Sequence, residues 1–192
     1  SIYADALCAD GSSMVTEFIY WSDYYNSIIS PFYSYSTGRT KETLRSSQVT
    51  CRDIDGDGCI EIPEDTSSKK QSSEITSQNW VNYGNTVLSH KCYSFSCKRD
   101  GYILVIDDDD FSKVKANYDS ESRKLTIINK KNKSNVFEIV TLINSNYSVN
   151  DPKYKDYTMI MKNSGFVYLA KVNKSSDIDI NIQTLKDMIK VY

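Results

Sequence analysis

Six potential oxygen ligands fall within the segment Asp53 to Glu64, DIDGDGCIEIPE, at a spacing that suits a calcium ion. Asp53, Asp55 and Asp57 alternate, so their carboxylates converge when the backbone curls around a cation. Gly58 permits the sharp turn that three close carboxylates require. We therefore predict one Ca²⁺ bound by the carboxylates of Asp53, Asp55 and Asp57 and the carbonyl of Cys59, with Glu61 or Glu64 completing the site.

The residues on either side of this segment favour strands over helices. SSQVTCR before it is β-prone, and DTSSKKQSS after it has no apolar stripe at helical spacing. We expect a strand to leave the loop at Ile60. An EF-hand has the same ligand spacing but would require a helix on each side, so it stays a third alternative.

The acidic segment resembles the calcium loops of integrin-type (FG-GAP or VCBS) β-propeller repeats. Over residues 3–64 the succession YADALCADGSSMVTEFIYW, an Arg45-containing stretch and DIDGDGCIEIP is similar to the last repeats of a propeller-like region. That arrangement resembles uncharacterised secreted lipoproteins of Gram-positive, clostridia-like bacteria. The resemblance implies a structural rather than a catalytic calcium. The stretch from Cys92 to Ile103, the strand NVFEIVTLI and a terminal helix weakly resemble the PsbP/Mog1-like α/β sandwich.

Other candidate sites in the sequence have weaker support than the acidic segment. His90 and Cys92 would share one face of a strand, but no partner at motif spacing completes a zinc site, so we favour a buried or disulfide-paired Cys92–Cys97 hairpin. The run from Asp107 to Asp110 lacks the glycine and alternation of the first loop, and we interpret it as a solvated turn. The sequence has no phosphate-binding, zinc-protease or nucleophile-elbow motif. We expect a non-catalytic protein; the alternative is a cell-envelope hydrolase with an acid pair that the spacing does not identify.

A dense group of aromatic residues precedes the acidic segment. Such rings can form a core, which we favour, or a surface that stacks on a carbohydrate or anchors a protein ligand. The members are Phe18, Tyr20, Trp21, Tyr24, Tyr25, Phe32, Tyr33 and Tyr35.

Composition and charge limit the partners and the compartment. The net charge of −2 provides no basic field for nucleic acid. No apolar run approaches the length of about 18 residues that a transmembrane helix needs. Five cysteines cannot all pair within the chain. Because calcium is scarce in the cytosol and sites of this kind belong to extracellular modules, we expect an extracellular or surface-anchored protein.

The elements that must position the acidic loop are mainly strands. Fifteen tyrosines and several alternating segments indicate a β-rich chain. We predict a β-rich region at 1–65, a polar linker at 66–78 and an α+β domain at 79–192. In that last domain an antiparallel sheet is followed by a helix with Asn181 as N-cap and Ile182, Leu185, Met188 and Ile189 on one face.

Overall fold

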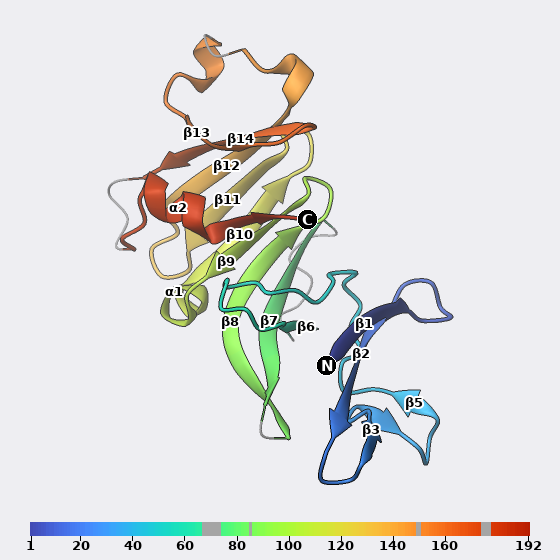
Figure 1. Ribbon diagram of the computed structural model, residues 1–192. Helices are drawn as coiled ribbons and strands as arrows, with labels where there is room; N and C mark the ends of the chain where they lie inside the picture. The colour runs from blue at the N-terminus through green and yellow to red at the C-terminus, as the bar shows by residue number, and fades with distance from the viewer. Residues whose placement is uncertain (67–73, 85, 149–150, 174–177) are drawn as a thin grey trace. The chain divides into compact units, whose positions relative to one another are not determined.

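The computed structural model describes residues 1–66, 74–84, 86–148, 151–173 and 178–192. Strands account for 51% of the residues and helices for 11%. The sheets are antiparallel and one helix lies near the C-terminus, which confirms the predicted α+β class. Two compact units are present (Figure 1). The N-terminal unit comprises residues 1–67 and 77–93, and the C-terminal unit comprises residues 68–76 and 94–192.

The N-terminal unit contains short antiparallel strands. β1, β2 and β3 form one sheet in that order, β4 pairs with β5, and β6 pairs with β7. The bounds are β1 (Ile2–Leu7), β2 (Met14–Ser22), β3 (Ser27–Ile29), β4 (Tyr33–Ser34), β5 (Arg39–Thr40) and β6 (Ile62–Asp65). Long strands β7 (Ile75–Gly84) and β8 (Val87–Cys97) each contribute residues to both units.

A small aromatic and aliphatic core holds this unit together. Phe18, Phe32, Ile62 and Val81 are its buried members, and partly buried Tyr3, Tyr20, Cys51, Tyr83 and Leu88 pack against them. β2 alternates buried and half-buried residues from Met14 to Phe18, as expected of a strand with one face on a core. Ile62 is completely buried and is the first residue of β6, so the strand that follows the acidic segment is anchored in the core.

A buried polar network braces the same unit. The Arg45 guanidinium is buried and donates to Asp5 Oδ1 at 2.7 Å, to Thr16 Oγ1 at 3.0 Å and to Val49 O at 2.9 Å. Asp5 Oδ2 accepts from the backbone N–H of Cys51 at 2.8 Å. Since a buried charge is tolerated when it is paired and hydrogen-bonded, this network fixes the chain just before the acidic segment.

In the C-terminal unit, the order β10-β11-β12-β14-β13 forms a five-stranded antiparallel sheet, and β15 pairs with β9 (Figure 1). α2 contacts β9, β13, β14 and β15 and buries Leu185 in the main core. The bounds are β9 (Tyr102–Ile106), α1 (Asp108–Lys113), β10 (Val114–Asp119), β11 (Lys124–Asn129), β12 (Asn135–Ile143), β13 (Thr158–Lys162), β14 (Phe166–Val172), α2 (Ile182–Met188) and β15 (Ile189–Val191), with single 3₁₀ turns at Asn144–Asn146 and Pro152–Tyr154.

The sequence predictions for elements are confirmed at some points and wrong at others. The Asn181 side chain caps α2 by accepting from Thr184 N at 3.0 Å, as predicted, but Ile189 begins β15 instead of extending the helix. The aspartate run is not a plain turn: Asp108, Asp109 and Asp110 form the first turn of α1, where negative charge complements the helix dipole. In the predicted linker, residues 67–73 lie outside the described residues, and Ile75 to Gln78 belong to β7.

Within the described ranges, no helix combines the length and the apolar character that crossing a bilayer would require.

Candidate metal centre

The acidic loop, residues 53–60, is closed at its base by a single antiparallel bridge. The backbone N–H of Arg52 donates to Glu61 O at 3.0 Å, and the N–H of Glu61 donates back to Arg52 O at 2.9 Å. Gly56 and Gly58 adopt φ values of +84° and +85°, which side-chain-bearing residues rarely reach. β6 follows from Ile62, two residues later than predicted. The described segment from 50 to 66 contains no helix, so the flanks of an EF-hand are absent there.

Asp53 organises the loop from its first position. Its Oδ1 accepts from the backbone N–H groups of Gly56 at 2.7 Å and Asp57 at 3.1 Å, and its Oδ2 accepts from Gly58 at 3.0 Å. The carboxylate therefore curls the chain around itself, as an aspartate at the head of a turn does. Of the three aspartates whose convergence the spacing predicted, Asp53 and Asp55 lie in the carboxylate cluster described next, and Asp57 is not a member of it.

Three carboxylates form the cluster at the centre of the site. Asp53, Asp55 and Glu61 each place one oxygen so that the three atoms lie within 4.8 Å of one another. Asp53 and Asp55 are exposed, whereas the side chain of Glu61 lies at 0% exposure beneath them. The cluster therefore combines a buried ligand at the base with two ligands that face solvent.

Glu61 has an unsatisfied oxygen. Its Oε2 accepts from the backbone N–H of Ile54 at 3.0 Å, but its buried Oε1 has no hydrogen-bond partner in the described part of the chain. Burial, followed by the negative charges of Asp55 and Asp57, raises the pKa of Glu61. A buried carboxylate oxygen without a donor is costly unless a cation or a proton neutralises it.

Lys91, from β8, supplies a positive charge on the outer side of the loop. Its Nζ lies 2.6 Å from Asp57 Oδ2 and 3.2 Å from Asp55 Oδ2. The Lys91 ammonium holds the pKa of Asp57 below its usual range, and the two carboxylates raise the pKa of Lys91. Asp55 thus serves both the carboxylate cluster and the lysine, whereas Asp57 Oδ2 is directed to Lys91.

The remaining predicted ligands lie at the edges. Cys59 is exposed; its backbone N–H donates to Asp57 Oδ1 at 2.8 Å, and the neighbouring Asp57 carboxylate raises the pKa of its thiol. Glu64 lies in β6, where its Oε2 accepts from Asn79 Nδ2 at 2.9 Å, and it is not part of the three-carboxylate cluster. Asn79 Oδ1 in turn hydrogen-bonds the Nδ1 of His90. The role of Lys91 has no signal in the spacing of the loop, because it lies in a different strand.

The aromatic group near the N-terminus divides between core and surface. Phe18 and Phe32 are buried with Tyr20 packed beside them, as the favoured core interpretation predicted. Trp21, Tyr24 and Tyr25 lie at the β2–β3 hairpin and are 57%, 88% and 66% exposed. The Trp21 indole N–H donates to Asp23 Oδ1 at 3.0 Å, which orients the ring. The rings of Tyr24 and Tyr25 meet edge to face, with their centroids 4.8 Å apart.

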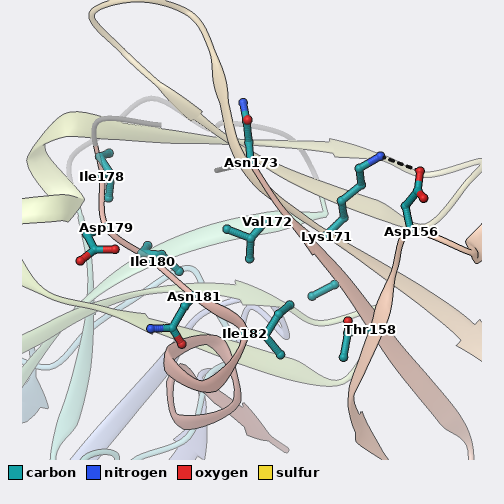
Figure 2. A pocket seen from close by; sticks show the side chains of 11 residues that line it. Asp156, Thr158, Lys171, Val172, Asn173, Ile178, Asp179, Ile180, Asn181 and Ile182 are labelled. Carbon is teal, nitrogen blue, oxygen red and sulfur yellow. Dashed lines mark hydrogen bonds and ion pairs between the residues drawn. The ribbon is translucent and has the colours of Figure 1, made fainter. Parts of the chain in front are cut away.

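The C-terminal unit has a cavity of about 460 Å³ between β14 and the residues that lead into α2 (Figure 2). Its floor is apolar, with Val172, Ile180 and Ile182, and an ion pair between Lys171 and Asp156 at 3.4 Å lies on its rim. This cavity lacks a cluster of metal-binding side chains among the residues described, in contrast to the acidic loop. None of the five cysteines forms a disulfide in the structure, so of the two alternatives for Cys92 and Cys97, burial or a disulfide, the disulfide is wrong; Cys97 is buried and Cys92 is half-buried.

Comparison of the chain with protein-family models, with curated proteins and with solved structures gave no match.

Proposed function

We propose that the N-terminal unit is a calcium-binding, non-catalytic module in which one Ca²⁺ is held by Asp53, Asp55 and Glu61. The observation that carries this proposal is that Glu61, whose buried Oε1 has no donor in the described chain, belongs to a cluster of three carboxylates. A divalent cation would satisfy this oxygen and remove the repulsion among the three charges.

The chemistry of the donors favours calcium over other common metals. The cluster offers only carboxylate oxygens, which suit Ca²⁺ or Mg²⁺ better than zinc, whose sites are built from cysteine and histidine. The Asp53 carboxylate accepts hydrogen bonds from the backbone N–H groups of Gly56 and Gly58, and residues 53–60 contain no helix or strand. Calcium tolerates the irregular coordination that such a loop offers. Magnesium requires near-ideal octahedral geometry and retains its waters, so it would bind more weakly.

The ion would have a structural effect through Glu61. This residue bridges to Arg52 before the loop and precedes Ile62, which is completely buried in the aromatic core. Neutralising Glu61 would therefore stabilise the entry to β6 and the loop base together. Because ligand binding to the folded state alone stabilises it, calcium should raise the melting temperature of this unit.

An extracellular or cell-surface location follows from the same proposal. Sites with few ligands and two solvent-exposed carboxylates bind calcium weakly, and such sites fill where calcium is abundant, outside the cytosol. The exposed Trp21, Tyr24 and Tyr25 would provide a contact surface for a protein or carbohydrate ligand. Asp23 supports this role by holding the Trp21 indole in one orientation.

Isothermal titration calorimetry of chelator-stripped protein with CaCl₂ tests the proposal. We expect one binding event for the wild-type chain and at least about tenfold weaker binding for Asp55→Asn, which removes one ligand charge. Asp10→Asn is the matched control, because Asp10 also accepts from backbone N–H groups in an exposed turn of this unit, those of Ser12 and Ser13 at 2.8 Å. The absence of calcium binding to wild type, or equal losses in both variants, would refute the site.

A further inference from the structure

We infer that Lys91 is a built-in competitor of calcium: a tethered cation that neutralises the outer carboxylates of the acidic loop and lowers its affinity for Ca²⁺. This inference rests on the proposed calcium site. It adds a residue from β8 that sets the affinity of the site, and it follows from the two contacts that the lysine makes within the loop.

Asp55 is shared between the carboxylate cluster and Lys91. One carboxylate oxygen of Asp55 belongs to the cluster with Asp53 and Glu61, and its Oδ2 lies 3.2 Å from Lys91 Nζ. A calcium ion bound at the cluster would therefore lie near a fixed positive charge. Charges of equal sign at such separations repel each other measurably even at a protein surface.

Asp57 is paired with Lys91 outside the carboxylate cluster. Its Oδ2 lies 2.6 Å from Lys91 Nζ, and its Oδ1 accepts from the backbone N–H of Cys59 at 2.8 Å. The third aspartate of the D-x-D-x-D motif is thereby directed to the lysine, and the carboxylate cluster consists of the other two aspartates with Glu61. For Asp57 to join the ion, Lys91 would have to release it.

Lys91 is well placed to compete with calcium for the carboxylates of the loop. The side chains of Lys91, Asp55 and Asp57 are 26%, 31% and 37% exposed, so their interactions are only partly screened by solvent. Arg52 precedes the loop in sequence, and its backbone pairs with Glu61 at the base of the loop. Lys91 therefore reduces the net negative charge that calcium meets at the loop.

The test is calcium titration of Lys91→Met by calorimetry beside wild type. Methionine keeps most of the aliphatic stem and removes the charge. We expect Lys91→Met to bind calcium on the order of tenfold more tightly at low salt, and the difference should shrink as salt is raised, because it is electrostatic. Lys91→Arg, which keeps the charge, should bind like wild type. Lys113→Met, which breaks an exposed ion pair with Asp110 in the C-terminal unit, controls for net charge.

The outcomes separate this inference from the calcium proposal. Wild-type binding with an unchanged or weaker affinity in Lys91→Met would overturn the competitor role and leave the calcium site standing. A gain that persists in 1 M salt would also overturn it, because packing rather than charge would then be the cause. If neither wild type nor Lys91→Met bound calcium, the calcium proposal itself would fall and the competitor role with it. Melting curves in chelator verify that each variant is folded.

Discussion

Glu61 accepts a hydrogen bond from the backbone N–H of Ile54 at 3.0 Å through Oε2, while its Oε1, equally buried, meets no donor among the described residues. The bond ties the base of the acidic loop to its second residue. The Glu61 carboxylate also forms the cluster with Asp53 and Asp55. An ionised Glu61 in this position opposes folding until a positive charge neutralises it, and this is why we connect the loop with calcium.

Whether wild type or Glu61→Gln is the more stable protein should depend on calcium. In chelator, Glu61→Gln should melt at the same temperature as wild type or higher, because the amide removes a buried charge beside Asp55 and Asp57. In millimolar calcium, wild type should melt at the higher temperature, since the variant has lost a charged ligand. Melting curves of both proteins under both conditions provide the measurement. An order that calcium leaves unchanged would argue against Glu61 as a ligand.

The division of the aromatic group between core and surface predicts unequal effects of truncation. Phe18 is 7% exposed and contacts the rings of Tyr3 and Tyr83, so Phe18→Ala should lower the free energy of unfolding by about 3–5 kcal/mol. Tyr24 is 88% exposed, and Tyr24→Ala should change it by less than about 0.5 kcal/mol. Urea unfolding followed by circular dichroism compares the two. Similar losses in both variants would mean that the hairpin rings also form core.

A buried ion pair in the C-terminal unit should matter for stability regardless of calcium. Asp100 is fully buried; its Oδ1 accepts from Arg123 Nε at 2.7 Å and its Oδ2 accepts from Tyr118 Oη at 2.8 Å. Asp100→Ala leaves both donors without their acceptor and should cost about 3–5 kcal/mol. Urea titrations in calcium and in chelator should give the same loss. A loss that depended on calcium would contradict the assignment of the ion to the N-terminal unit.

Asp65 should contribute to acid sensitivity. Its burial favours the neutral carboxyl, but hydrogen bonds from Ser47 and Ser46 outweigh this and lower its pKa below 3.8. Because the unfolded chain then binds the proton more readily, the contribution of Asp65 is present above pH 3.8 and is lost as the pH falls through the lowered pKa. Asp65→Asn should be less stable than wild type at pH 7, with the gap closing below pH 3.8. Chelator-stripped protein melted across this range tests it; a constant gap would assign the loss to packing.

Much of the fold could be predicted from local patterns. The alternation at the start of β2, the nearly continuous apolar runs of β12 and β14 and the Asn181 cap of α2 are properties of neighbouring residues, and the sequence displays them directly. In β10 buried Val114, Ala116 and Tyr118 alternate with exposed charged and polar residues, a short pattern for which the sequence analysis made no prediction. The start of β7 was assigned to a linker because its polar residues Thr76 to Asn79 obscure the pattern.

The candidate site was predictable only where its residues are close in sequence. Asp53, Asp55 and Glu61 come from the predicted set, since a turn brings alternating acids together. The pairing of Asp57 with Lys91 depends on where β8 passes, and the spacing of the loop carries no information about that. The burial of Glu61 beneath the loop likewise depends on the position of Ile62 in the aromatic core.

Calcium binding by the acidic loop can be tested without any substitution, by measuring the melting temperature of the unmodified protein as calcium is added after treatment with chelator. We expect the melting temperature to rise progressively with calcium above the dissociation constant, because the ion binds the folded state alone. Magnesium at equal concentrations should give a smaller rise. A melting temperature that stays constant from chelator to millimolar calcium would rule out calcium binding by the acidic loop, which would then be a solvent-exposed turn held by Asp53 and Lys91.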